Sequence, residues 1–325
     1  MLSLSTQSRF SSIVASSIGN VASSRLSEGA RGIVQGVYDA AINIFFPNGL
    51  VSVVPEVVQR GPFNVTLPNL GPLELSSFGI RVGDEVSVKD QTLKISDRLL
   101  ILFGSAKIFS PKQEFTLSML ADSEIEANIE FMRKTVLIFG DMAGLGGLLA
   151  LTLPRRAEAP AESLNIFASS ALYRIVKLEK AFQKAEKDAL KCAVNELIGL
   201  GPGLTPSSDD MLAGLVLICV LYTKNRGCLL PANQLVAAAT LEVSRGHTTM
   251  LSEEFLMQAA LGRGNEPIMR LCAALLTEGR ESVERETRRV LAIGATSGTD
   301  MVLGIILGTL LCMGKRLNMM KEEYE

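Results

Sequence analysis

The sequence predicts an α+β fold in which a small antiparallel β-sheet or barrel is followed by a mostly helical bundle. Short β-prone runs separated by turn residues fill residues 31–115, and helical periods dominate residues 116–325. A Ser-rich N-terminal segment, residues 1–30, precedes both. With 325 residues, the chain is long enough for two domains and a sizeable core.

The β-prone runs are identified by their alternating side chains and by the residues between them. In EVSVKDQTLKIS, apolar residues alternate with polar ones, as in a strand with one buried face. The turn-forming groups PNG, RGP, NLGP and VGD separate the runs. The expected strand-forming runs are residues 32–46, 50–56, 63–68, 85–96 and 98–104.

The C-terminal part predicts a bundle of roughly six or seven helices. Residues 169–199 have the pattern of one long amphipathic helix that ends at Gly199. Three more helices are expected to begin near Pro206, Pro231 and Pro267, because proline fits the first helical position. Two further helices are expected, a charged surface helix at residues 281–292 and a buried one at residues 299–316.

Composition excludes several classes of protein. The net charge is −2, so no excess of cations is available to neutralise a nucleic-acid backbone. The five cysteines include no Cys-x-x-Cys pair, which favours a reducing, cytoplasmic location over a disulfide-built secreted protein. The apolar run at residues 136–154 contains Asp141 and several glycines, so we expect buried core segments and no membrane span.

No cofactor or metal site is predicted. A single histidine excludes a His-rich metal site, although carboxylates alone could hold magnesium. Motifs for a nucleophile elbow, a dinucleotide fingerprint and a phosphate-binding P-loop are absent.

The stretch GLGPGLTPSSDDMLAG is the first candidate site. Gly201 and Gly203 allow positive φ angles and a close approach of a ligand to the backbone. The helix start that follows would expose N–H groups and a positive dipole end, which suit an anion. Capping alone could explain this composition, but the surplus of glycines and hydroxyls favours a ligand. The candidate anion-binding and catalytic residues here are Gly201, Gly203, Thr205, Ser207, Ser208 and Asp210.

The stretch SRGHTTMLSEEF is the second candidate, and it holds the only histidine. His247 and Arg245 could do acid–base work or polarise a carbonyl group, with Thr248 and Thr249 binding substrate. A lone histidine is, however, more often an ordinary loop or core residue.

The stretch GATSGTD is the third candidate and resembles the first. Ser297, Gly298, Thr299 and Asp300 open a buried helix, and SGTDMVLG shares Ser, Asp, Met and Gly with SSDDMLAG. Taken alone, this segment reads as a helix cap. Together, the three helix starts could converge on a pocket for a small anion. Residues 140–149, which are rich in glycine, could add a further wall, although tight helix packing is the favoured explanation there.

Three motifs, GLGPGLTPSSDDMLAG, TTMLS followed by AALGRGNE, and IGATSGTDMVLG, give the chain a wider resemblance. In this order they resemble the AllH-type subunit family of oxamate carbamoyltransferase, over roughly residues 32–312. The resemblance implies a cytosolic enzyme subunit of anaerobic allantoin and purine breakdown. It implies a reaction in which oxalurate and phosphate give oxamate and carbamoyl phosphate, and it implies other carbamoyltransferase subunits as partners.

The residues can be set against that reaction as hypotheses. Both substrates are anions, so the site needs N–H donors and helix dipoles. The helix start at residues 203–208 could hold phosphate, and Gly298 with Thr299 could hold the substrate carboxylate. Asp210 and Asp300 could orient the carbamoyl NH₂ group, bind magnesium or only cap their helices. The alternative function is a non-catalytic scaffold or a ligand-binding regulatory subunit, since no obvious catalytic dyad is present.

Overall fold

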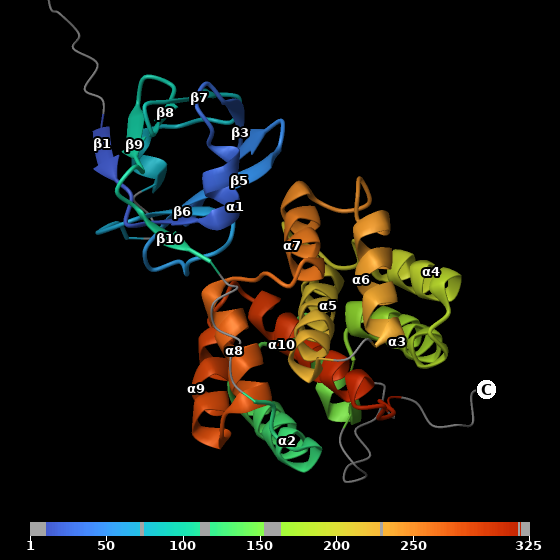
Figure 1. Ribbon diagram of the computed structural model, residues 1–325. Helices are drawn as coiled ribbons and strands as arrows, with labels where there is room; N and C mark the ends of the chain where they lie inside the picture. Colours follow the sequence, from blue (N-terminus) through green and yellow to red (C-terminus); the bar gives the residue numbers. More distant parts are fainter. Residues whose placement is uncertain are drawn as a thin grey trace, which may run out of the picture. The chain divides into compact units, whose positions relative to one another are not determined.

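The computed structural model describes residues 11–71, 75–110, 118–152, 164–227, 230–317 and 319. The chain forms two compact units, residues 1–111 and residues 112–325 (Figure 1). The expected boundary between residues 115 and 116 lies in residues 111–117, outside the described residues. Cys228 also lies outside them.

The first unit is built on a sheet of ten described strands in the order β1-β9-β8-β7-β3-β4-β5-β6-β2-β10. Residues 11–30, expected to be a separate segment, supply β1, β2 and the short helix α1. The strands are β1 Ser11–Val14, β2 Ser17–Gly19, β3 Arg31–Tyr38, β4 Ala41–Phe46, β5 Gly49–Pro55, β6 Asn64–Leu67, β7 Glu85–Lys89, β8 Thr92–Ile95, β9 Leu99–Leu102 and β10 Lys107–Phe109, with α1 at Asn20–Arg25 and a 3₁₀ turn, η1, at Leu75–Phe78.

The expected antiparallel sheet is confirmed for most neighbouring strands, but three strand pairs are parallel. The pairs β1–β9, β2–β10 and β5–β6 are parallel, so the sheet is mixed. Alternation of side chains identifies a strand without identifying its partner or direction. Strands that follow one another in the chain, such as β7 and β8 in the EVSVKDQTLKIS run, pair antiparallel as expected. The core of this unit is formed by the buried aliphatic faces of these strands.

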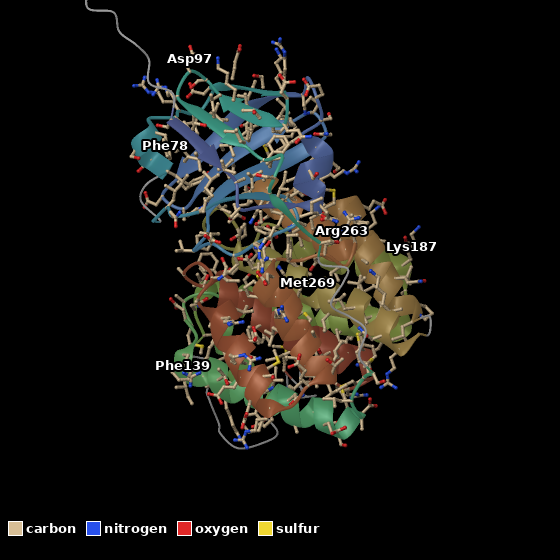
Figure 2. All side chains as sticks on the ribbon, turned by 60° about the vertical axis from the view of Figure 1, so that its left-hand side comes forward. Phe78, Asp97, Phe139, Lys187, Arg263 and Met269 are labelled. Carbon is tan, nitrogen blue, oxygen red and sulfur yellow. The ribbon has the colours of Figure 1, made fainter. Side chains whose placement is uncertain are left out.

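The second unit is helical, and the α+β class is therefore confirmed. Figure 1 shows α5 and α10 in the middle of this unit, with α2, α8 and α9 on one side and α3, α4 and α6 on the other. Met269 of α8, labelled in Figure 2, belongs to its buried core. The described helices are α2 Asp122–Phe139, η3 Gly146–Thr152, α3 Ile166–Lys184, α4 Lys187–Leu197, α5 Ser207–Arg226, α6 Pro231–Val243, α7 Met250–Ala260, α8 Glu266–Thr277, α9 Arg280–Leu291 and α10 Ser297–Cys312.

Two expectations about the helices need correction. Nine α-helices, α2 to α10, are described in this unit, more than the six or seven expected. The single long helix expected at residues 169–199 is two helices, because Ala185 adopts a left-handed conformation with φ 51° that ends α3. An alanine carries no turn signal in the sequence, so the break was not visible there. The starts near Pro206, Pro231 and Pro267 are confirmed by α5, α6 and α8.

Helices α5 and α10 are the buried centre of the unit. They run in the same direction, since Gly304 packs on Met211 near one end and Cys312 lies near Cys219 at the other. Most residues of both helices are buried, which explains their lack of a polar stripe. None of the helices in the described part of the chain is long and apolar enough to span a bilayer.

Candidate functional site

The candidate site lies where α5 and α10 begin, because the two parallel helices bring their N-termini together. The hydroxyls of Thr205, before α5, and Ser297, at the start of α10, are 3.1 Å apart and share a hydrogen bond. Both side chains are half-buried. The first and third sequence candidates are thus joined by a direct side-chain contact.

Asp210 lies behind these hydroxyls, and its carboxyl group is 2% exposed. Burial raises its pKa to about 8, and the hydroxyls of Ser297 and Thr205 oppose this shift by hydrogen bonding. The neighbouring carboxyls of Asp300 and Asp209 add to the rise in pKa. Its Oδ2 atom is buried without a hydrogen-bond partner among the described residues. Near neutral pH, this group is therefore mostly a neutral carboxylic acid.

Asp300 occupies the equivalent position in the first turn of α10. It is fully buried, and burial raises its pKa to about 6. The backbone N–H of Leu145 donates to its Oδ1 at 2.6 Å, and the hydroxyls of Ser207 and Thr296 also lower its pKa. Each aspartate is thus approached by the serine that opens the other helix.

The same reciprocal arrangement is found in the packing of α5 against α10. A Cβ on Gly304 would lie 1.9 Å from the carbonyl oxygen of Met211, and one on Gly214 would lie 2.3 Å from that of Met301. Because the sequence echo pairs Met211 with Met301 and Gly214 with Gly304, the two contacts are equivalent. The weak repeat in the sequence therefore corresponds to an approximate two-fold relation between the helix starts.

The two halves differ in what covers them. Ser207, beside Asp300, is 3% exposed. A Cβ on Gly144 would lie 2.5 Å from Asp300 Oδ2, so the backbone at Gly144 and Leu145 closes over that carboxyl. Thr205 and Ser297, beside Asp210, are both partly exposed. Thr296, beside Asp300, is also partly exposed. The halves differ because Asp300 is bound by the Leu145 N–H and covered near Gly144, whereas Asp210 has two partly exposed hydroxyls beside it.

The glycine-rich loop before α5 is held by internal bonds. Ser208 is fully buried, and its hydroxyl bonds the backbone of Leu200 and Leu197, so we assign it to the loop framework. Asp209 accepts the Gly199 N–H at 2.7 Å and the Thr248 hydroxyl. These two bonds tie the loop to the segment before α7.

Several backbone N–H groups of this loop have no hydrogen-bond acceptor among the described residues. The backbone N–H groups of Gly201, Gly203 and Leu204 donate no hydrogen bond to any described residue. Gly201 and Gly203 have φ angles of 125° and 95°, which only glycine adopts easily. The loop thus presents backbone donors beside the start of α5.

The second sequence candidate is adjacent to the loop but less enclosed. His247 and Arg245 are exposed, and Nδ1 of His247 lies 3.1 Å from the Arg245 carbonyl oxygen. Thr249 is the N-cap of α7, accepting the Ser252 N–H at 3.1 Å and donating to the Leu204 carbonyl. Thr248 and Thr249 therefore fasten the loop. Among the described residues, no carboxylate forms a hydrogen bond with either ring nitrogen of His247.

Gly298 and Thr299 are placed by packing around the start of α10. A Cβ on Gly298 would lie 2.0 Å from the Val290 carbonyl oxygen, so only glycine fits there. Thr299 is 1% exposed, and its hydroxyl accepts the Asp141 N–H at 3.0 Å. Both residues hold α10 against its neighbours rather than lining the surface.

Sequence reasoning missed three contributors to this region. Leu145 supplies the N–H on Asp300, Asp209 anchors the loop, and Asn165 donates to the carbonyls of Met142, Ala143 and Gly144. Local composition marked Asp209 as one of two adjacent aspartates and Leu145 as part of the glycine-rich run, without predicting their contacts, and it gave no signal for Asn165. The glycine run at residues 140–149 packs tightly, as the favoured explanation held.

Magnesium on these carboxylates was left open by the sequence. Across the described ranges, no group of three or more His, Cys, Asp or Glu side chains is arranged to hold a metal ion. Asp210 and Asp300 are instead surrounded by hydroxyls and N–H groups, which suit hydrogen bonding to a ligand.

Two family models match the chain. The model described as "Oxamate carbamoyltransferase subunit AllH" matches residues 197–309, from the last residue of α4 to the body of α10. The model described as "AllH family N-terminal domain" matches residues 13–108, within the β unit. No solved structure matches the chain. The family indicated by the sequence motifs is confirmed, and the chain belongs to the AllH family of oxamate carbamoyltransferase subunits.

Proposed function

We propose that this subunit carries the carbamoyl-substrate site of its enzyme at the paired starts of α5 and α10. The reaction is the conversion of oxalurate and phosphate to oxamate and carbamoyl phosphate. The observation that supports the proposal is the Thr205–Ser297 hydroxyl pair in front of the buried, partnerless oxygen of Asp210. Buried polar atoms are normally satisfied, and the Oδ2 atoms of both Asp210 and Asp300 lack a partner among the described residues, which supports a ligand at these helix starts. The partly exposed hydroxyls of Thr205 and Ser297 favour the Asp210 side.

The electrostatics of this arrangement suit anionic substrates. An ionised aspartate pair would repel phosphate and oxalurate, but burial keeps Asp210 largely neutral near pH 7. The N-terminus of α5 then contributes its positive dipole end without an opposing full charge from Asp210, whereas Asp300, with a pKa of about 6, is mostly ionised at the start of α10. The free N–H groups of Gly201 and Gly203 add donors beside α5.

The residues divide into two sets in this proposal. Thr205, Ser297 and the unused N–H groups of Gly201, Gly203 and Leu204 contact the substrate. Ser207, Ser208, Thr248, Thr249, Gly298 and Thr299 hold that surface in place. His247 and Arg245 are exposed beside the loop, so they are candidates for contacts that form only with substrate or with another subunit.

The proposed setting is a cytoplasmic complex with other carbamoyltransferase subunits. The family description calls the chain a subunit, which supports partners. A scaffold or regulatory subunit would use the same hydroxyl pair to bind ligand while a partner performs the chemistry.

Thermal denaturation of the isolated chain with oxalurate, carbamoyl phosphate or inorganic phosphate tests the site. We expect a ligand-dependent rise in Tm, because a ligand that binds only the folded state stabilises it. Thr205→Val and Ser297→Ala should remove the rise, and Ser169→Ala, at an exposed position on α3, should keep it. A rise unaffected by Thr205→Val, Ser297→Ala and His247→Ala would rule out this site.

The same variants separate the two functions. Assembled with the partner subunits, Thr205→Val should lower carbamoyl phosphate formation if the site is catalytic. If ligand binding is lost but turnover at saturating substrate is kept, the chain is a regulatory subunit.

A further inference from the structure

The approximate two-fold relation between α5 and α10 sets two buried aspartates in equivalent places with different access. Asp300 has its Oδ1 bound by the Leu145 N–H and lies against the backbone at Gly144. Of the two hydroxyls beside Asp300, that of Ser207 is buried and that of Thr296 is partly exposed. Asp210 has the Thr205 and Ser297 hydroxyls beside it, and both are partly exposed. A substrate at this surface would meet the hydroxyls first and Asp210 only through them.

From this asymmetry we infer that Asp210 is a positioning residue that passes a proton to the substrate through the Thr205 and Ser297 hydroxyls, whereas Asp300 is structural. The inference rests on the proposed function, since it assigns a role within that site. Hydroxyls can donate and accept at once, so they can relay a proton that the buried carboxyl holds.

The reaction requires such a proton. A phosphate oxygen forms a bond to the carbamoyl carbon of oxalurate, and the bond from that carbon to the oxamate nitrogen breaks. The leaving nitrogen takes a proton from a hydroxyl of the Thr205–Ser297 pair, which takes one from Asp210. Phosphate enters as hydrogen phosphate, and its proton restores Asp210, so atoms and charge balance over the cycle.

The protonation state of Asp210 supports this role. Burial raises its pKa to about 8, so at neutral pH the carboxyl still holds the proton that a general acid must give. The charged groups that face it are Asp209 on its own helix and Asp300 on α10. Asp300 has a pKa of about 6 and is mostly ionised at neutral pH, which favours retention of the proton on Asp210.

The test is the pH profile of carbamoyl phosphate formation by the assembled enzyme, with Asp210→Asn and Asp300→Asn as a matched pair. We expect the unmodified enzyme to lose activity as pH rises through about 8. Asp210→Asn should lower kcat by about 100-fold or more and abolish this alkaline limb, while oxalurate still raises the Tm of the isolated chain. Asp300→Asn should keep the alkaline limb.

An alkaline limb that persists in Asp210→Asn, or is lost equally in Asp300→Asn, would overturn the inference while leaving the site itself intact. Failure of ligand binding by the unmodified chain would instead overturn the proposed function. If Asp210→Asn does not fold, Thr205→Ser and Thr205→Val decide the question. The relay requires that Ser, which keeps a hydroxyl, retain kcat and the alkaline limb, and that Val lower kcat at saturating substrate.

Discussion

Gly304 of α10 lies directly against the backbone carbonyl of Met211 in α5, so closely that a side chain has no room between the helices. The equivalent contact, Gly214 on Met301, repeats it from the other helix. These glycines let two largely buried helices approach at the backbone level, and this approach brings Thr205 within hydrogen-bond distance of Ser297. The geometry of the candidate site therefore depends on the close packing of α5 against α10 in the core.

Gly304→Ala should destabilise the helical unit strongly. Its Cβ would lie 1.9 Å from a backbone oxygen, so the helices must separate, at a cost of about 3 kcal/mol or more. Chemical denaturation measures this loss. Gly279→Ala is the control, because that position has open space around it and a φ of −89°, and its effect should stay within about 1 kcal/mol. Equal stability of the two variants would contradict the close packing.

Asp210→Asn should change the pH dependence of stability. The folded state holds the Asp210 proton more tightly than the unfolded chain, since burial raises its pKa from 3.8 to about 8. Stability from this group is therefore full at low pH and is lost as pH rises through about 8, by an amount on the order of a few kcal/mol. Asparagine resembles the neutral acid and does not ionise. The free energy of unfolding of Asp210→Asn, relative to that of the unmodified chain, should therefore increase with pH up to about 8 and then level off.

Denaturation curves at several pH values between 5 and 9 check this expectation, and Asp300→Asn provides a comparison. Burial raises the pKa of Asp300 in the folded state to about 6. The stability difference between Asp300→Asn and the unmodified chain should therefore stop changing at a lower pH than that of Asp210→Asn. If the free energy of unfolding of Asp210→Asn differed from that of the unmodified chain by the same amount at every pH in this range, Asp210 would not be buried as described.

The sequence predicted the two kinds of structure and the helix starts near prolines, because hydrophobic period and proline geometry are local signals. It also indicated the similarity between the starts of α5 and α10. It could not predict that β1 and β2 join the sheet, or that Leu145 reaches Asp300, since these contacts join distant parts of the chain. The burial of Ser208 was equally invisible, because a hydroxyl in a loop looks the same whether it binds a ligand or the loop itself.

Asn165 should be important for the backbone that covers Asp300. Its side-chain oxygen caps α3 by accepting the Ala168 N–H at 2.8 Å, and its amide nitrogen bonds the carbonyls of Met142, Ala143 and Gly144. Asn165→Ala loses both functions and should cost about 2 kcal/mol. Asn165→Asp keeps the cap but loses the donors, so hydrogen exchange should rise at residues 142–145 while the start of α3 stays protected. Equal exchange in both variants at these two places would contradict this division of roles.

Ala185→Gly should stabilise the protein, which most substitutions do not. Ala185 ends α3 in a left-handed conformation, with φ 51° and ψ 41°, and its N–H bonds the carbonyls of Ala181 and Phe182. Glycine adopts this conformation without the strain that a Cβ brings, so we expect a gain of about 0.5–1 kcal/mol. Ala189→Gly, inside α4, is the matched control and should cost about 1 kcal/mol, because glycine is unfavourable within a helix. If α3 and α4 were one continuous helix, both substitutions would destabilise by a similar amount, so the opposite signs measured by denaturation test the break between them.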